Sequence, residues 1–303
     1  MIYTITFNPS LDYYVKVNNL KSGTVNRAIS ERLEVGGKGI NVSLALKELD
    51  ELTTAFAFVG GFTGKVIREK LAQSGLTCNF IEVDGQSRIN VKIKSTNETD
   101  VNGTGAQVLA QHIDKLTAKL KRVLKPGDWV VVSGSVPTNL GENTYSDFLN
   151  SIKGKRGVKV VVDACGNLLL NTLKFKPFLI KPNVYELCEI FNLSTTPDKK
   201  QIIACARKLQ EMGARNVIVS MGSQGAVMVT ETEQSLFIRA MKGQVVNSVG
   251  AGDSMIAGFI HEYIASNNYF AALNFATAAG TACAFTAGIA TRSQIEYVAS
   301  FMN

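Results

Sequence analysis

After residue 105 the sequence alternates between helical patterns and short, continuous apolar runs, and this alternation constrains the fold more than any other feature. Four such pairs occur: HIDKLTAKLKRVLK before DWVVVSGS, TYSDFLNSIKGKRG before VKVVVDA, a short helical segment near Leu168 before PFLIKPN, and QIIACARKLQEMG before NVIVSMG. Strands that are apolar along their whole length are buried on both faces, so helices must cover each side of their sheet. The pattern therefore predicts a doubly wound α/β fold with a mainly parallel central sheet.

The first 105 residues show a different pattern, in which apolar and polar residues alternate over short segments. These segments are YTITF, YYVKV, VNRAISERLEV, and the pair RINVKIKS and ETDVN around the turn residues Thr96 and Asn97. Alternation with period two is typical of strands with one exposed face. We expect a small sheet that stands off the main body. Because no linker or repeat interrupts the chain, residues 1–303 are interpreted as one domain with this sheet as an appendage.

Composition narrows the classes of partner. Lys and Arg outnumber Asp and Glu by 32 to 25, for a net charge of +7, which suits an anionic small ligand. No aromatic residues are interleaved with the basic run at 115–125, so a nucleic-acid partner is not expected. No apolar run is long enough to span a membrane, and the first residues do not resemble a signal peptide. The five cysteines form no C-x-x-C pair, so we expect a cytoplasmic protein without disulfides or a zinc site.

Small and polar residues follow five predicted strands: SGS after Val132, DA after Val162, KPN after Ile180, SMGSQG after Val219 and GAGD after Val249. Ligands of doubly wound folds bind beyond the carboxyl ends of the strands. Glycine permits close approach of the backbone, and a helix that begins there offers free N–H groups to an anion. We therefore expect a phosphate group at this edge of the sheet. The standard phosphate loop and the dinucleotide fingerprint are both missing from the sequence, and His112 and His261 lie in ordinary helical patterns.

Asp253, in the stretch VNSVGAGDSMIAGF, is the strongest candidate for chemistry. A carboxylate beside an anion site can accept the proton of a hydroxyl group while the backbone amides of Gly250, Ala251 and Gly252 hold a phosphoryl group. The alternative is that Asp253 only caps the N-terminus of a helix. The short G-x-G-D string by itself does not decide between these two roles.

Four motifs, read together, resemble the PfkB family of sugar kinases, which have a ribokinase-like fold. They are NPSLD, GGKGINVSLALKEL, IKPNVYE and NSVGAGDSMIAG, and they span the chain from Asn8 to Gly258 in the order found in that family. The resemblance implies a three-layer sandwich with a β-sheet lid formed by residues of about 10–35 and 87–104. It also implies ATP as phosphoryl donor, Mg²⁺ as cofactor and a homodimer formed through the lid, while a role for K⁺ stays open.

The resemblance assigns roles to individual residues. Asp253 is the catalytic base, and the amides of Gly250, Ala251 and Gly252 form the anion hole. The residues expected to bind the sugar are Asp12, Gly37, Asn41 and Ser133. Those expected to bind the nucleotide are Lys181, Asn183, Ser220, Gly222, Gly225, Ser248 and Gly252, with Glu186 contacting the metal through water. Asn247 and Ser248 depart from the Asp-Thr pair that the wider family has before the glycines.

Three basic residues indicate the substrate. Arg27 and Arg88, expected on strands of the lid, match positions where members that act on sugar phosphates hold the phosphate, and Lys38 lies in the glycine turn. A buried phosphate dianion needs such charge-assisted partners. These residues indicate only that the acceptor already carries a phosphate. The resemblance further implies ATP-dependent phosphorylation of fructose 1-phosphate at its 6-hydroxyl. Tagatose 6-phosphate and fructose 6-phosphate are alternative substrates, and a catalytically silent sugar-phosphate sensor is an alternative of another class.

Overall fold

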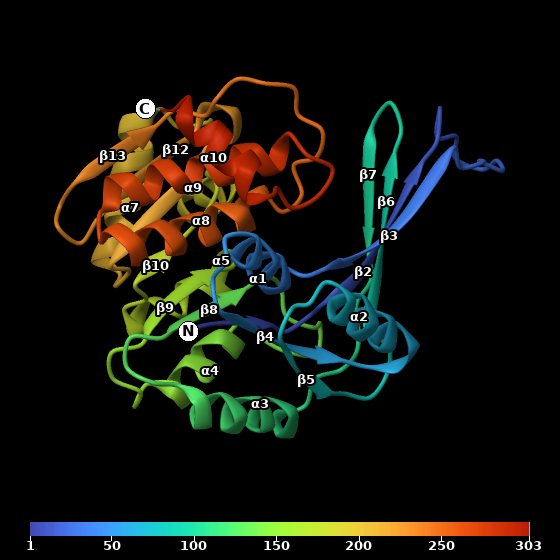
Figure 1. Cartoon of the computed structure of the whole chain (residues 1–303), viewed down its shortest axis with the longest axis horizontal. Coiled ribbons are helices and arrows are strands. Elements are labelled where there is room, and N and C mark those ends of the chain that lie inside the picture. Colours follow the sequence, from blue (N-terminus) through green and yellow to red (C-terminus); the bar gives the residue numbers. More distant parts are fainter. Residues whose placement is uncertain (303) are drawn as a thin grey trace.

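A nine-stranded sheet forms the centre of the computed structural model, which describes residues 1–302 (Figure 1). Its strands lie in the order β13-β12-β11-β10-β9-β8-β1-β4-β5. Their bounds are β1 Ile2–Thr6, β4 Thr53–Val59, β5 Cys78–Glu82, β8 Trp129–Ser133, β9 Lys159–Asp163, β10 Leu179–Ile180, β11 Asn216–Ser220, β12 Ala226–Val229 and β13 Ser235–Ile238. All neighbours are parallel except β11 with β12 and β12 with β13. The predicted mainly parallel sheet is confirmed.

Strand β1 corrects one prediction from the sequence. The segment YTITF was expected in the small sheet, but β1 pairs in parallel with β4 and β8 at the middle of the large one, and all of its residues are buried. The alternation is misleading because its polar residues are buried too: Thr4 Oγ1 lies 2.8 Å from Ser43 Oγ on the overlying helix. A hydrogen bond inside the core removes most of the cost of burying a hydroxyl. The main body therefore begins at residue 2.

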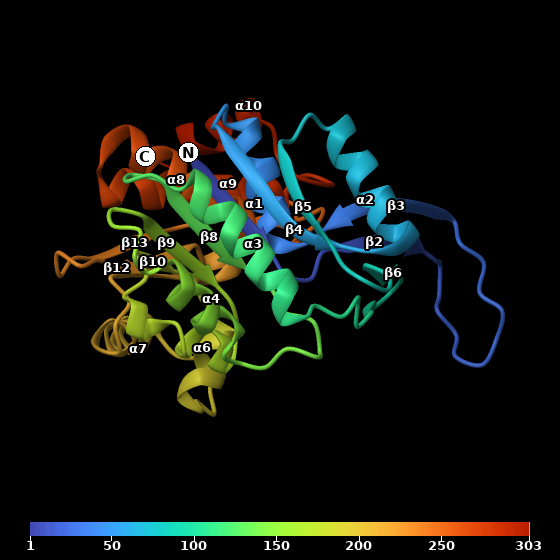
Figure 2. The ribbon, with the colours of Figure 1, turned by 90° about the horizontal axis from the view of Figure 1, so that it is seen from below.

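Helices cover both faces of the large sheet (Figures 1 and 2). The helices are α1 Lys38–Glu48, α2 Gly61–Gln73, α3 Ala110–Val123, α4 Thr144–Ile152, α5 Gly166–Leu170, α6 Val184–Phe191, α7 Lys199–Glu211, α8 Ala251–Ser266, α9 Tyr269–Ala284 and α10 Arg292–Ser300, with short 3₁₀ turns η1 Leu173–Phe175 and η2 Gly222–Gln224. In one apolar core, the five helices from α3 through α7 pack against one face of the sheet. In another, α1, α8 and α9 pack against the opposite face. Within residues 1–302, no helix has both the length and the apolar character required to cross a membrane.

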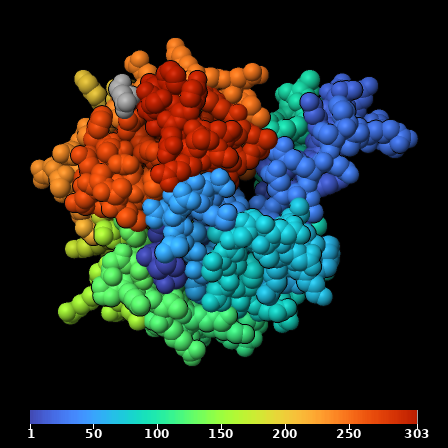
Figure 3. Space-filling view, in the orientation of Figure 1, coloured from blue at the N-terminus to red at the C-terminus, as the bar shows by residue number. Residues whose placement is uncertain are grey.

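A second sheet of four strands stands away from the main body, on the right in Figure 1. Its order is β3-β2-β6-β7, with bounds β2 Ser10–Lys16, β3 Ser30–Gly36, β6 Arg88–Lys94 and β7 Glu98–Asn102. We call it the lid sheet. Strands β2 and β6 are parallel neighbours, while β3 and β7 pair antiparallel with them at the edges. The loop between β2 and β3 forms the projecting tip of the molecule (Figure 3).

Candidate functional site

The glycine turn at Gly250 begins helix α8 at the same edge of the sheet as the ends of β9 and β10. Gly250 has φ of 84°, a left-handed conformation that glycine adopts without strain, and it precedes the first helical residue, Ala251. A side chain at Gly252 would place its Cβ only 3.1 Å from Nζ of Lys181. The turn therefore combines the amides of a helix N-terminus, of which that of Ala251 already donates to Ser248 O at 3.3 Å, with a lysine ammonium group, an arrangement suited to an anion.

Asp253, in the first turn of α8, is 5% exposed, and its Oδ2 accepts a hydrogen bond of 2.8 Å from Nδ2 of Asn41. Burial, and next the negative charge of Asp163, raise the pKa of Asp253 from 3.8 to about 6, although Lys38, Asn41 and Lys181 oppose the shift. The carboxylate is thus ionised at neutral pH yet far more basic than a carboxylate in water. This property suits a general base. Asp253 is also not the cap of α8, because the N-cap residue is Gly250 and no side chain forms a capping hydrogen bond there.

Asp163 joins the site from the end of β9, and sequence reasoning did not select it. Its Oδ2 lies 3.3 Å from Nζ of Lys38 and accepts a 3.4 Å hydrogen bond from Ser133 Oγ, while its Oδ1 lies 3.4 Å from Nζ of Lys181. Burial alone would raise the pKa of Asp163, but the two lysines more than offset this and lower it. The sequence did contain a signal for Asp163, because it is the first residue of the DA pair that follows Val162 at one of the five predicted strand ends.

Asp12 lies on β2 of the lid sheet, where its carboxylate is fixed by neighbours. Its Oδ1 accepts hydrogen bonds from Ser10 Oγ at 2.7 Å and from Nδ2 of Asn90 at 2.8 Å. Asn90 faces Asp12 across the β2–β6 pair and is a second residue that the sequence analysis missed. A side chain at Gly36 would come within 2.5 Å of Asp12 Oδ2, so the glycine permits this close approach. A glycine at position 36 is therefore required for the position of the Asp12 carboxylate.

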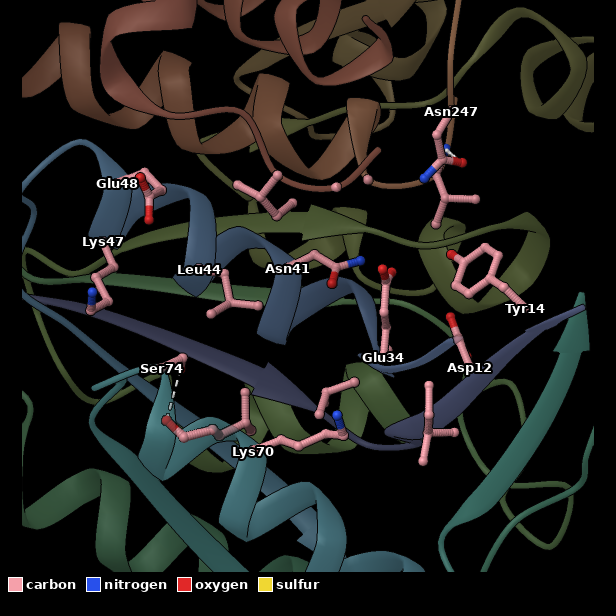
Figure 4. Close-up of a pocket in the computed structure, with 18 of the residues that line it drawn as sticks. Asp12, Tyr14, Glu34, Asn41, Leu44, Lys47, Glu48, Lys70, Ser74 and Asn247 are labelled. Carbon is pink, nitrogen blue, oxygen red and sulfur yellow. Dashed lines mark hydrogen bonds between the residues drawn. The ribbon is translucent and has the colours of Figure 1, made fainter. Parts of the chain in front are cut away.

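Two hollows flank the turn from Gly36 to Lys38. The first, of about 420 Å³, is lined by Asp12, Gly36, Asn41, Asn247 and Gly250, among others. In Figure 4 the side chains of Asp12, Glu34 and Asn41 gather around its centre, from the lid sheet and α1. The second, of about 380 Å³, is lined by Asn8, Lys38, Arg88, Ser133 and Cys165. The predicted sugar residues thus divide between two adjoining spaces.

The two predicted arginines have different positions. Arg88 begins β6, is half-buried, and donates from Nε to the backbone oxygen of Asn8 at 3.1 Å, beside Lys38 in the second hollow. Arg27 was expected on a strand, which is wrong: it lies in the exposed loop before β3, and the first residue of β3, Ser30, pairs with Lys16 at the far end of β2. Arg27 is therefore not brought to the site within its own chain.

The residues predicted to bind the nucleotide lie at the ends of β10 and β11. Asn183 and Glu186 form a reciprocal cap of α6: Asn183 Oδ1 accepts from Glu186 N, and Glu186 Oε2 accepts from Asn183 N, both at 2.8 Å. Asn183 is also paired with Ser220 across the strand ends. Gly222 and Gly225 flank η2 with φ of 57° and 99°, where a side chain would be strained. Gly222 has open space beside it, whereas a Cβ at Gly225 would lie 2.0 Å from the backbone oxygen of Ile238, so Gly225 allows the chain to pack against the end of β13.

The remaining predicted residues lie beside these groups. Ser248 O accepts a 3.3 Å hydrogen bond from Ala251 N, which places Ser248 directly before the glycine turn. Gly37 has φ of 126° and precedes α1, so it continues the close approach that begins at Gly36. Within residues 1–302, no group of three or more His, Cys, Asp or Glu side chains could hold a metal ion. A metal would therefore need ligands from a bound molecule or from water.

The shifted pKa of Asp253 predicts a pH-dependent effect on stability. A carboxyl group whose folded pKa is raised loses stability as pH increases through that value, since the unfolded chain ionises more readily. Relative to the wild type, Asp253→Asn should gain about 3 kcal/mol of unfolding free energy between pH 4 and pH 8, from the shift of 3.8 to about 6. Denaturant titrations across this range measure it. The exposed Asp84→Asn is the matched control, and a pH-independent difference for Asp253→Asn would contradict the shift.

Comparisons with known proteins agree with this arrangement. The family model described as pfkB family carbohydrate kinase matches residues 6–295. The 1-phosphofructokinase of Bacillus subtilis is 39% identical over 98% of this chain and 96% of its own length. The D-tagatose-1-phosphate kinase of Bacillus licheniformis is 35% identical over 99% of this chain and 98% of its own length.

Solved structures share the fold as well. A Staphylococcus aureus protein assigned as a phosphofructokinase is 41% identical, with a TM-score of 0.84 over 99% of this chain and 97% of its own. Escherichia coli phosphofructokinase-2 is 25% identical, with TM-scores of 0.91 for a potassium complex and 0.90 for a tetrameric inhibited form, each covering 99% of this chain and 98% of the other. The chain therefore belongs to the pfkB family of carbohydrate kinases.

Proposed function

We propose that the protein is a 1-phosphofructokinase, which transfers the terminal phosphoryl group of ATP to the 6-hydroxyl of fructose 1-phosphate. The observation that carries this proposal is the buried Asp253, with its pKa raised to about 6, next to a glycine turn and the ammonium of Lys181. Relatives that are 39% identical over nearly the whole chain and are named 1-phosphofructokinase support the choice of substrate.

In the proposed reaction, Asp253 accepts the proton of the acceptor hydroxyl as the oxygen attacks the phosphoryl group. The amides of Gly250, Ala251 and Gly252 and the ammonium of Lys181 stabilise the negative charge of the transferring group. Because Asn41 donates to Oδ2 of Asp253, it orients the carboxylate while leaving Oδ1 available to the hydroxyl. The site thus supplies two groups that phosphoryl transfer to an alcohol uses: an acceptor for the hydroxyl proton, and donors that stabilise the negative charge of the phosphoryl group.

The acceptor is proposed to lie across the two hollows. Asp12 and Asn41, with the backbone of Gly37, would bind its hydroxyl groups, and Arg88, Lys38 and Ser133 would bind the phosphate that it already carries. The distribution of charge supports this division. The second hollow is lined by Lys38 and Arg88 and by no carboxylate, whereas in the first hollow two lysines are accompanied by three carboxylates, Asp12, Glu34 and Glu48. A phosphate dianion needs charged donors when it leaves water.

ATP is proposed to lie along Lys181, Asn183, Ser220, Gly222, Gly225 and Ser248, with its terminal phosphate at Gly252. Glu186 would contact Mg²⁺ through water, and the metal would supply charge neutralisation for the triphosphate. One carboxylate among hydrogen-bonding neighbours fits this arrangement, because Mg²⁺ normally keeps waters and takes the remaining ligands from phosphate oxygens. K⁺ is the further cation to test, given the potassium complex of the Escherichia coli protein.

We further propose a homodimer through the lid sheet, in the cytoplasm. The apolar side chains of Val25, Ile29, Ile89 and Val101 are exposed on the lid sheet and its tip, as expected for a surface that contacts another molecule. Arg27 lies at this tip, so a role for it in phosphate binding would require the site of a second copy. Escherichia coli phosphofructokinase-2 has a tetrameric form. The five free cysteines agree with a reducing compartment.

A tagatose 1-phosphate kinase is the second candidate, favoured by the Bacillus licheniformis relative. The substrates of both candidate enzymes carry their phosphate on C1, so contacts of that phosphate with Arg88 and Lys38 cannot distinguish fructose 1-phosphate from tagatose 1-phosphate. Tagatose 6-phosphate, fructose 6-phosphate and a silent sensor are weaker alternatives. The intact Asp253 and its glycine turn oppose a sensor.

A substrate comparison tests the proposal directly. ADP release is measured with ATP and each of fructose 1-phosphate, tagatose 1-phosphate, fructose 6-phosphate, tagatose 6-phosphate and free fructose. We expect the largest kcat/KM for fructose 1-phosphate and very little turnover of free fructose, which lacks the anion that Arg88 would bind. A preference for tagatose 1-phosphate would establish the second candidate, and a preference for a 6-phosphate would reject both.

Arg88→Ala tests the phosphate subsite. Losing a charge-assisted contact to the bound phosphate should raise the KM for the sugar phosphate by about 10- to 100-fold and leave the KM for ATP nearly unchanged. Arg68→Ala removes a half-buried arginine on α2 that pairs with Glu82 and lines neither of the two hollows, so it serves as the control. A rise in the KM for ATP instead would assign Arg88 to the nucleotide.

Asp253→Asn tests the base. The amide keeps the shape of the side chain but accepts a proton poorly, so kcat should fall by roughly 10²- to 10⁴-fold while both substrates still bind. Steady-state kinetics together with equilibrium binding of ATP measure the two effects separately. Turnover within a few-fold of the wild type would reject Asp253 as the base.

A further inference from the structure

Asp163 is a fully buried carboxylate to which the proposed reaction gives no part. It is the last residue of β9, is 1% exposed, and pairs with Ser133 at the end of β8. Its backbone oxygen also accepts a 2.9 Å hydrogen bond from Gly134 N. Both its backbone and its side chain are therefore fixed at the edge of the sheet where the acceptor and donor residues meet. A buried charge in such a place is costly unless opposite charges compensate for the lost hydration.

The two lysines that face Asp163 come from opposite sides of the site. Lys38 begins α1 and lines the hollow that contains Arg88, on the acceptor side. Lys181 follows β10, and its Nζ lies 3.1 Å from the position of a Cβ at Gly252, on the donor side. Each ammonium group contacts a different oxygen of Asp163, at 3.3 and 3.4 Å. One carboxylate therefore links a cation of each half-site.

We propose that Asp163 is a positioning residue for the kinase reaction, which holds Lys38 toward the acceptor and Lys181 toward the phosphoryl group in transfer. The inference rests on the proposed function but not on which ketohexose phosphate is the substrate. Without a counter-charge, the buried ammonium of Lys181 would be costly to keep beside the glycine turn. With a single carboxylate for two ammonium groups, the three groups retain a net positive charge that can attract phosphate oxygens.

The distances support positioning more than a closed ion pair. Contacts of 3.3 and 3.4 Å are longer than the 2.7–2.9 Å that is typical of charge-assisted hydrogen bonds, and Oδ1 of Asp163 has no hydrogen-bond partner among the described residues. Each ammonium group has three donors, so most of them stay available for a phosphate. Metal ligation is the competing role for Asp163, and it is disfavoured because both oxygens already face a positive charge.

Kinetic coupling between Asp163 and Lys181 tests the proposal. The kcat of Asp163→Asn, Lys181→Met and the double variant is measured with the preferred substrate. We expect each single variant to lose about 10- to 1,000-fold in kcat, and the double variant to lose less than about threefold beyond Lys181→Met, because the two residues act as a unit. Losses that multiply would overturn the proposal. So would a large rise in the Mg²⁺ concentration needed by Asp163→Asn, which would indicate metal ligation.

The matched control is Asp128→Asn. Asp128 is a buried aspartate that lies 3.2 Å from the N-terminal ammonium group and accepts a hydrogen bond from Lys125 N, at the opposite end of the sheet. It undergoes the same chemical change, so it should lower stability and leave kcat within about twofold. A loss of kcat in this control equal to that of Asp163→Asn would mean that removing any buried acid has this effect, and would overturn the proposal.

Two readouts keep the test independent of folding and of substrate. If Asp163→Asn does not fold, Lys38→Met should raise the KM for the sugar phosphate alone, and Lys181→Met should lower kcat or raise the KM for ATP; effects on the same substrate would overturn the proposal.

If no sugar phosphate is turned over, the proposed function fails, but the charged groups remain testable. The pH dependence of the stability difference between Asp253→Asn and its parent is then measured with and without Asp163→Asn. Removing the negative charge of Asp163 should shift the midpoint of this dependence to lower pH, and an unchanged midpoint would overturn the interaction between the two acids. The groups that face Asp253 are Lys38, Asn41, Asp163, Lys181 and Cys283.

Discussion

The structure of the site depends on a balance of charge in a place with little water. Asp163 and Asp253 are both buried, and the negative charge of Asp163 raises the pKa of Asp253, while Lys38 and Lys181 lower the pKa of both acids. Lys38 and Lys181 contact Asp163 directly, which leaves Asp253 only partly compensated. One acid is consequently held ionised, and the other remains basic enough to remove a proton. The difference between the two carboxylates arises from position and not from residue type.

The fold provides this balance by bringing distant segments to one edge of the sheet. Asp163 and Lys181 follow adjacent parallel strands, Lys38 begins the helix after the lid strand β3, and Asp253 begins α8. Parallel strands place all of their carboxyl ends on the same side, so loops that are far apart in sequence converge there. The dense packing of α8 on α9 fixes the direction of the glycine turn, since Gly258 approaches Ala279 too closely for a side chain. The site therefore depends on core packing well away from it.

Much of this could be predicted from the sequence, because continuous apolar strands and glycine turns are strong local signals. The mainly parallel sheet and the Asp253 turn follow from such signals. The errors have physical causes: β1 was placed in the wrong sheet because Thr4 is polar but is satisfied inside the core, a contact between distant residues. Arg27 was assigned to a strand that begins only at Ser30. The roles of Asp163 and Asn90 depend on partners in other strands, which no local pattern reveals.

The tight packing of the turn at residues 36–39 explains why this turn does not select the substrate. A Cβ at Gly36 would meet Asp12, and one at Gly37 or Gly39 would meet the side chain of Thr6 at 2.8 or 2.5 Å. The turn is therefore constrained by backbone contacts with β1 and the lid sheet, and it has no freedom to adapt to one sugar. Under the proposed function, discrimination between ketohexose phosphates would come from side chains that line the two hollows, among them Asp12 on β2, Glu34 on β3 and Arg88 on β6. In the proposed function, the groups that carry out phosphoryl transfer therefore lie at the edge of the large sheet, and the acceptor is bound between that edge and the lid sheet.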